Sequence, residues 1–134
     1  MRTMHTLYCY VDGSDNQAIE PVLVDAFRAL VSDWAQYCAV FVNHQHERTP
    51  DLAPDDLNDW FIGLNLPLPC VSQSQIDQLV LFAKAMAGAT GRDFVVGISL
   101  PSGLCEDLVF LDANADETEG LRLYTRLEAV LHGA

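Results

Sequence analysis

The sequence predicts a single α+β domain of two layers, in which three helices cover one face of a mixed, mostly antiparallel five-stranded sheet. Three observations lead to this prediction. The chain has 134 residues, the length of one domain, which we expect to span residues 1–134. Half of its residues are apolar, which suits a packed core and excludes a disordered chain. Short β-rich segments alternate with helical periodicity in the order β-α-β-β-α-β-β-α.

The first two elements are a strand and a helix. Residues 7–11 are apolar and aromatic and are followed by turn-forming residues, which predicts a short strand. From Ile19 to Trp34, apolar residues recur with helical spacing. Pro21 suits the first turn of this helix, because its missing N–H needs no partner there, so we expect the helix to begin at 18–20. The predicted apolar face consists of Ile19, Val22, Leu23, Ala26, Phe27, Leu30, Val31 and Trp34.

Two further strands flank a long connection. Residues 37–43 are β-branched and aromatic and apolar on both faces, which predicts a strand in the centre of the sheet. Residues 60–66 predict a third strand, which Pro67 ends. The connection between them, 44–59, contains two prolines and four aspartates and exceeds the usual loop length. Loops of this length are commonly functional.

A second helix follows the third strand. Ser72 and Gln75 form the S-x-x-Q pattern of a capping box, and Gly88 or Gly91 is expected to end the helix. Its predicted apolar face consists of Ile76, Leu79, Val80, Ala83, Met86 and Ala87.

The last three elements are a hairpin and a helix. Residues 94–100 and 108–111 predict two strands joined by a proline- and glycine-containing turn. Asp116 with Glu119 is suited to cap a final helix. The apolar face of that helix consists of Leu123, Leu127, Val130 and Leu131.

Two of the predicted strands resemble each other. Residues 61–67 read Phe-Ile-Gly-Leu-Asn-Leu-Pro, and residues 95–101 read Val-Val-Gly-Ile-Ser-Leu-Pro. A helix follows the first copy and a strand follows the second, so we interpret the similarity as local and not as a domain repeat.

The charge of the chain is unevenly distributed. The chain has 19 acidic and 7 basic residues, for a formal net charge of −12. Residues 49–83 hold five acidic residues and residues 93–121 hold seven, and neither segment contains lysine or arginine. This balance argues against binding to nucleic acids, whose phosphates require Lys and Arg, and against an anionic membrane surface. It favours a basic protein as the partner, because a negative field accelerates the encounter.

We expect a cytoplasmic protein with reduced thiols. No apolar run has the length of a membrane span, and the first residues lack the apolar core of a signal peptide. Cys9, Cys38, Cys70 and Cys105 are widely spaced and form no C-x-x-C pair. Pairing between two of them stays open, and so does the oligomeric state.

The predicted partner-binding residues lie in the two acidic segments. Trp60 follows four aspartates and is a candidate aromatic anchor within an acidic rim, with half-buried packing as the alternative. The alternative for both segments is a solvated surface with local roles for some carboxylates. Asp116 suits a helix cap, and Glu117 and Glu119 suit a first helical turn. Asp51, Asp55 and Asp56 suit turns that contain proline. The full set is Asp51, Asp55, Asp56, Asp59, Trp60, Glu106, Asp107, Asp112, Asp116, Glu117 and Glu119.

Two patterns concern metal ions. Asp12 and Asp15 follow the first strand and Asp112 ends the fifth, positions at which carboxylates can hold Mg²⁺. Cys38 and the two histidines of residues 44–46 have the same strand parity, which suits zinc if the strand extends over them. No Lys or Arg lies near the aspartates in the sequence, and the zinc pattern lacks a fourth ligand. We expect neither a metal nor a cofactor.

The absence of a nucleophile, dinucleotide or P-loop motif predicts a non-catalytic protein-binding protein. In size, acidity and lack of catalytic motifs, the chain resembles the acidic immunity proteins that neutralise basic bacterial toxins. That resemblance implies inhibition by occlusion, with residues 44–60 and 106–119 covering the basic groove of a toxin or effector. The element order also resembles type III secretion chaperones, which bind an effector client but begin with a helix and three strands. A metal-assisted hydrolase using Asp12, Asp15 and Asp112 is the third alternative.

Overall fold

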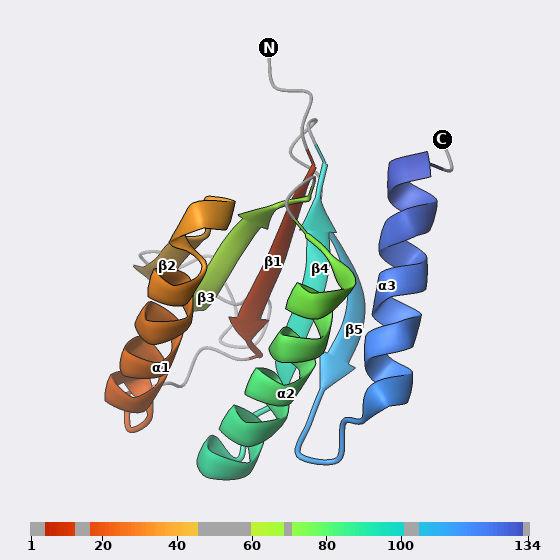
Figure 1. Ribbon diagram of the computed structural model, residues 1–134. Helices are drawn as coiled ribbons and strands as arrows, with labels where there is room; N and C mark the ends of the chain where they lie inside the picture. The colour runs from red at the N-terminus through yellow and green to blue at the C-terminus, as the bar shows by residue number, and fades with distance from the viewer. Residues whose placement is uncertain (1–4, 13–16, 46–59, 69–70, 101–104, 133–134) are drawn as a thin grey trace, which may run out of the picture.

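The computed structural model describes residues 5–12, 17–45, 60–68, 71–100 and 105–132, and over these residues it confirms the predicted α+β class and element order (Figure 1). The strands are β1 (Thr6–Val11), β2 (Val40–Gln45), β3 (Trp60–Pro67), β4 (Phe94–Ser99) and β5 (Cys105–Leu111). The helices are α1 (Glu20–Asp33), α2 (Gln73–Thr90) and α3 (Glu117–His132), and a short 3-10 helix, Ala35–Tyr37, follows α1.

The five strands form one sheet in the order β2-β3-β1-β4-β5, and every described pairing in it is antiparallel. Helix α1 connects β1 to β2, which lie on either side of β3, and α2 connects β3 to β4, which lie on either side of β1. This is the split β-α-β connectivity of ferredoxin-like sheets, here extended by β5 and α3. β1 is therefore the central strand, although it comes first in the sequence.

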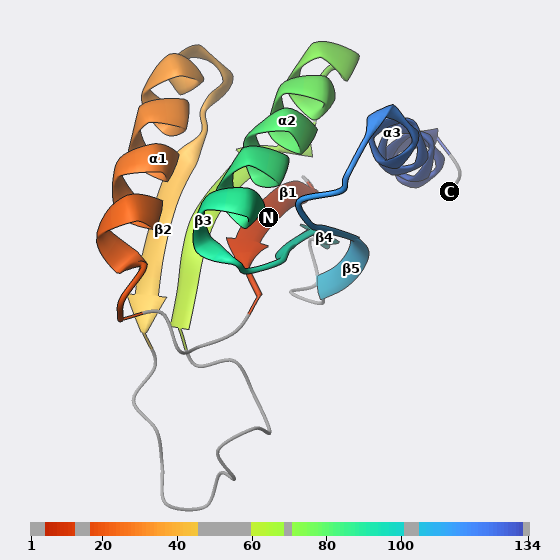
Figure 2. The same ribbon diagram turned by 90° about the horizontal axis from the view of Figure 1, so that it is seen from below.

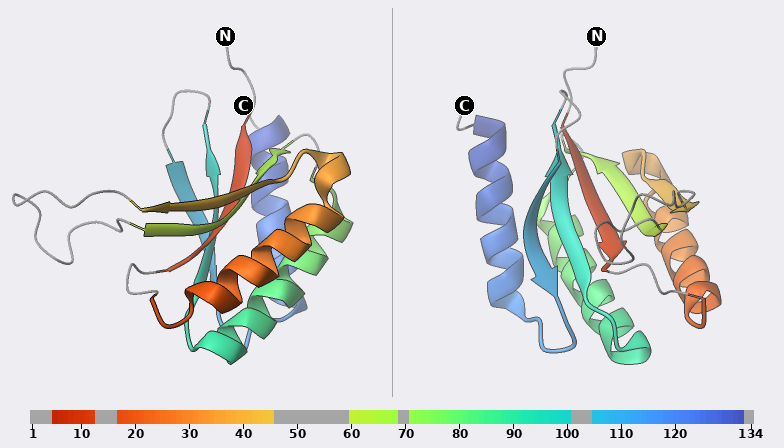
Figure 3. Two further views of the ribbon diagram at one scale, coloured as in Figure 1. Left: turned by 90° about the vertical axis from the view of Figure 1, so that its left-hand side faces the viewer. Right: turned by 180° about the vertical axis from the view of Figure 1, so that it is seen from behind.

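The three helices lie on the same side of the sheet (Figure 2). Between the two layers is one apolar core, to which β1 contributes Leu7, Cys9 and Val11 and α1 contributes Leu23 and Phe27. Seen from behind, the opposite side of the sheet has no described helix on it (Figure 3, right). We call that side the rear face. None of the described helices combines the length and the apolar character needed to cross a lipid bilayer.

The ends of the helices follow local rules that the sequence predicts. Pro21 lies in the first turn of α1. Ser72 and Gln75 form the expected capping box at the start of α2, with the Ser72 N–H donating to Gln75 Oε1 at 2.9 Å. Gly91 ends α2 with φ +72°, a left-handed conformation that glycine adopts without a steric cost. Trp34 is buried as predicted, and its Nε1 donates to Gln78 Oε1 at 3.1 Å.

The structure corrects two expectations. The second strand is not central but forms an edge of the sheet, where Val40 is 57 % exposed. Its apolar composition on both faces was therefore not a sign of burial on both faces. Val22, which belongs to the predicted apolar face of the first helix, is 49 % exposed because it lies at the margin of that face.

Candidate functional site

The side chains of the central strand divide between the two faces of the sheet. Leu7, Cys9 and Val11 point into the core, so alternation places Tyr8 and Tyr10 on the rear face. Tyr8 is 5 % exposed and Tyr10 is half-buried, although no helix packs on them. Side chains of the neighbouring strands contact these rings.

Two glycines in the flanking strands make room for the tyrosine rings. Tyr8 is paired with Gly97 of β4, and Tyr10 is paired with Gly63 of β3. A β-carbon at position 97 would lie 2.6 Å from Cζ of Tyr8, and one at position 63 would lie 2.7 Å from Cδ1 of Tyr10. Both separations are shorter than carbon atoms tolerate, so each ring lies against the sheet only because its neighbour is glycine.

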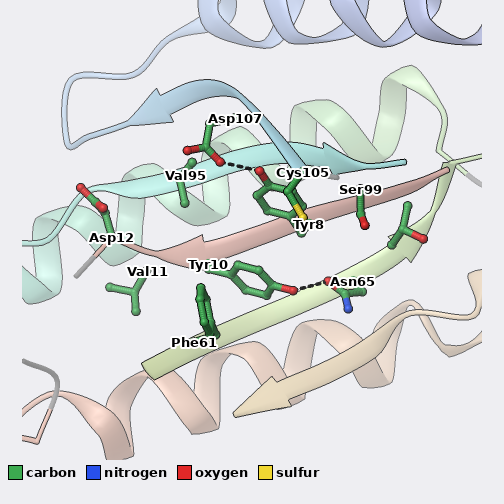
Figure 4. A pocket seen from close by; sticks show the side chains of 11 residues that line it. Tyr8, Tyr10, Val11, Asp12, Phe61, Asn65, Val95, Ser99, Cys105 and Asp107 are labelled. Atoms are coloured by element: carbon green, nitrogen blue, oxygen red, sulfur yellow. Dashed lines mark hydrogen bonds between the residues drawn. The ribbon is translucent and has the colours of Figure 1, made fainter. Parts of the chain in front are cut away.

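Hydrogen bonds and ring contacts hold the two tyrosines in place (Figure 4). The Tyr8 hydroxyl donates to a carboxylate oxygen of Asp107 on β5, and the Tyr10 hydroxyl donates to Oδ1 of Asn65 at 2.7 Å. The two rings are stacked, with centroids 5.2 Å apart and planes 11° apart. Phe61 meets Tyr10 edge to face at 5.5 Å. The rear face therefore carries an aromatic cluster on β1 and β3, which a hydrogen bond connects to β5.

This cluster forms part of a pocket of about 340 Å³, which is near the lower limit for small-ligand sites. Its lining combines aromatic rings, small polar groups and two carboxylates, and it includes no lysine, arginine or histidine from the described residues. The lining residues are Thr6, Tyr8, Tyr10, Val11, Asp12, Phe61, Asn65, Val95, Ser99, Cys105 and Asp107. We call this site the rear-face pocket.

Burial and the nearby carboxylate raise the pKa values of the two phenols in the pocket. Burial raises the pKa of Tyr10 to about 12. The pKa of Tyr8 is raised further, first by burial and then by the hydrogen bond to the Asp107 carboxylate. Both hydroxyls are protonated at neutral pH, as phenols ordinarily are, and donate to these partners, and the raised pKa values extend this state to alkaline pH. Among the described lining residues, the side chains with a formal charge are Asp12 and Asp107.

The acidic loop, as we call the predicted connection 44–59, lies mostly outside the described residues. Asp51, Asp55, Asp56 and Asp59 lie outside the described residues. Trp60 begins β3 opposite Gln45, but its side chain is not among those described.

The acidic residues of the second segment do not share one surface. Asp107 faces the rear-face pocket, whereas Glu106 is its neighbour on the strand and points to the other side. Several of the others have the local roles that the sequence offered as alternatives. Asp112 accepts the Asn114 N–H at 2.8 Å, Asp116 accepts the Thr118 N–H at 2.9 Å, and Glu119 pairs with Arg122 at 3.4 Å. Glu117 is the first residue of α3.

The structure does not bring together the residues that the sequence suggested as metal ligands. Asp12 lines the rear-face pocket, Asp112 follows β5 at the end of the sheet, and Asp15 lies outside the described residues. Cys38 does not share the strand with residues 44–46, since it lies in a left-handed turn, with φ 64°, before β2 begins. Among the residues that the structure describes, no three His, Cys, Asp or Glu side chains converge as a metal site.

Sequence reasoning missed Tyr8, Tyr10 and Asn65 as site residues. Two signals were available. In residues 7–11 the tyrosines alternate with core residues, and each of the two similar segments contains a glycine in the middle of a strand. The structure shows that these segments are β3 and β4, which flank β1 and place one glycine beside each tyrosine.

No protein-family model, curated protein or solved structure matches this chain. The inference of function consequently rests on the chemistry of the rear-face pocket and on the charge of the molecule.

Proposed function

We propose that this chain is a non-catalytic protein-binding protein that inhibits a basic partner by covering it, as acidic immunity proteins do with basic bacterial toxins. The observation that carries the proposal is the rear-face pocket, an aromatic site whose formally charged lining residues are both carboxylates. Aromatic side chains are enriched where protein interfaces derive most of their binding energy. A negative net charge of 12 adds attraction for a cationic surface over longer distances.

Exposed apolar side chains extend this surface beyond the pocket. Val40 on β2 is paired with Asn65, and Phe110 on β5 is paired with Val95, so both share the face of these two pocket residues. Val40 is 57 % exposed and Phe110 is 53 % exposed. The rear face therefore presents apolar contacts at both edges of the sheet with the pocket between them, an arrangement that suits a protein surface.

The acidic loop is a second part of the proposed contact. Its four aspartates lie in the sequence between β2 and β3, Trp60 begins β3, and the proposal assigns all five residues to the same basic partner. Glu106, Asp112, Asp116, Glu117 and Glu119 contribute to the negative field, whereas Asp107 contacts the partner directly.

The test is calorimetric titration of the chain with the basic product of the neighbouring reading frame, at low and at high salt. We expect a complex that weakens with salt, because exposed charges are screened. Tyr10→Ala is expected to weaken it at least about tenfold, in the range of an interface hot spot. Asp25→Asn on α1, on the opposite side of the molecule, is the control and is expected to leave the affinity within about twofold. Absence of a complex, or a complex that no rear-face substitution weakens, would contradict the proposal.

A separate test of the acidic loop compares two variants that each remove four negative charges. One variant replaces Asp51, Asp55, Asp56 and Asp59 by Asn. The other replaces four exposed acids on the helices and so removes the same charge elsewhere, at Asp25, Asp33, Asp77 and Glu128. A larger loss of affinity in the loop variant would support direct contact, whereas equal losses would remove the loop from the interface.

A further inference from the structure

The hydrogen-bonding character of the rear-face pocket restricts what it binds. Both tyrosine hydroxyls donate hydrogen bonds to groups of the protein itself, Asp107 and Asn65. Their oxygens consequently offer lone pairs to a ligand but no proton. A carboxylate accepts up to about four hydrogen bonds, so Asp107 retains acceptor capacity when Tyr8 donates to one of its oxygens. The charged and phenolic groups of the pocket are thus acceptors, and the hydroxyls of Thr6 and Ser99 can accept as well as donate, so a ligand rich in donors suits the pocket.

The aromatic rings add a second restriction. Tyr10 and Phe61 are half-buried and line the pocket, so parts of both rings are accessible to a ligand. The faces of aromatic rings carry negative partial charge and attract cations. The two carboxylates of the lining, Asp12 and Asp107, repel anions such as phosphate. A cation is therefore the matching ligand.

Among the cations that a protein partner presents, arginine fits these features better than lysine. Its guanidinium group has five N–H donors and no acceptor, it is planar, and it stacks on aromatic rings while donating two parallel hydrogen bonds to a carboxylate. The ammonium group of lysine is compact and strongly hydrated and has no plane to stack. In Figure 4 the Tyr8 ring lies between Asp107 and Tyr10, Phe61 lies on the far side of Tyr10, and all four side chains line the same pocket as Asp12.

We propose that the rear-face pocket binds the side chain of a single arginine of the partner, with the guanidinium group hydrogen-bonded to Asp107 and the rest of the side chain lying along the pocket over the rings of Tyr10 and Phe61. This inference rests on the proposed function for the identity of the partner. All the described lining residues nevertheless belong to this chain, so the pocket can be tested without a partner.

The experiment is an NMR titration of the chain with N-acetyl-arginine methylamide, observing the ring protons of Tyr8, Tyr10 and Phe61. N-acetyl-lysine methylamide and uridine monophosphate are the comparison ligands. We expect saturable shifts of these ring signals with the arginine compound, at least about fivefold weaker binding of the lysine compound, and none of the nucleotide. Equal binding of lysine, or preferential binding of the nucleotide, would overturn the inference, and so would an absence of shifts with the arginine compound.

Two variants locate the site. Asp107→Asn is expected to weaken arginine binding about tenfold, whereas Asp33→Asn on α1 removes the same charge outside the pocket and is expected to have no effect. Because Asp107→Asn also alters the partner of Tyr8, Phe61→Leu provides an independent test that leaves that hydrogen bond intact. Unchanged affinity in both pocket variants would contradict the assignment.

The outcomes separate the two proposals. If the arginine compound binds but no basic protein does, the pocket assignment stands and the proposed function fails. If a basic protein binds through the rear face and Asp107→Asn leaves its affinity unchanged, the proposed function stands and the arginine pocket fails.

Discussion

Tyr8 lies across Gly97, and its ring occupies the space that any larger residue at position 97 would need. The same ring reaches Asp107 on the next strand, which is itself paired with Gly97. One glycine thereby allows a side chain of β1 to reach over β4 and bond to β5. The rear-face pocket exists because of this contact and the equivalent one between Tyr10 and Gly63.

Substitution of Gly97 is expected to destabilise the protein. A β-carbon there meets both the Tyr8 ring and the backbone oxygen of Glu106, so Gly97→Ala should cost about 1–3 kcal/mol, the usual cost of overpacking. The matched control is Gly88→Ala in α2, where a β-carbon meets nothing within 4 Å. There the higher helix propensity of alanine should stabilise the protein by up to about 1 kcal/mol. Urea unfolding measures both, and a Gly97→Ala variant as stable as the unmodified protein would contradict the packing of Tyr8 on Gly97.

The pocket tyrosines are expected to make stability sensitive to alkaline pH. The folded-state pKa of Tyr10 is about 12, above its ordinary value of 10.0, so the folded protein holds the proton more tightly than the unfolded chain. The resulting stability is fully present below pH 10 and is lost as the pH rises towards 12. Urea unfolding across this range should show a smaller decline for Tyr10→Phe than for the unmodified protein. Identical slopes would show that Tyr10 is not buried as described.

Spectrophotometric titration gives an independent readout of Tyr8. Its pKa is raised more than that of Tyr10, by burial and by the Asp107 carboxylate. In the folded protein, Tyr8→Phe should therefore remove the component of the tyrosinate absorbance that appears at the highest pH. In urea the same variant should lose a component that titrates normally. If Tyr8→Phe instead removed a component of the absorbance that appears at lower pH in the folded protein, the hydrogen bond to Asp107 would be contradicted.

Cys9 is expected to be chemically inert in the folded protein. It is fully buried, and burial raises the pKa of its thiol to about 12. Thiolates, not thiols, react with alkylating reagents and disulfides. In a Cys70→Ser background, Cys38 and Cys105, which are exposed, should react in the native state, and Cys9 only after unfolding. Mass mapping of the labelled residues checks this, and native labelling of Cys9 would contradict its place in the core.

The capping box of α2 is expected to contribute measurably to stability. Ser72→Ala removes the capping side chain and should cost about 1 kcal/mol. Ser74→Ala, at an exposed position two residues later, should change the free energy of unfolding by no more than about 0.5 kcal/mol. Thermal and urea unfolding of the two variants provide the comparison. Equal effects would show that the cap does not stabilise the helix.

Local patterns predicted most of the elements. The periodic apolar residues from Ile19 to Trp34 predicted α1, and Ser72, Gln75 and Gly91 predicted both ends of α2. These signals succeed because helix periodicity and capping involve residues only a few positions apart. The same reasoning placed residues 37–43 in the centre of the sheet, which was wrong. Apolar composition reports burial in general and does not distinguish a core position from an exposed edge.

The sequence by itself determined the class of the fold, the order of its elements and the strongly negative charge, because each of these depends on local pattern or composition. Only the tertiary structure decided that β1 lies at the centre of the sheet, that Tyr8 and Tyr10 lie over Gly97 and Gly63, and that Asp107 joins them. The physical reason is strand register. Pairing of strands more than fifty residues apart sets which side chains meet, and a shift by one residue would turn the tyrosines to the opposite face.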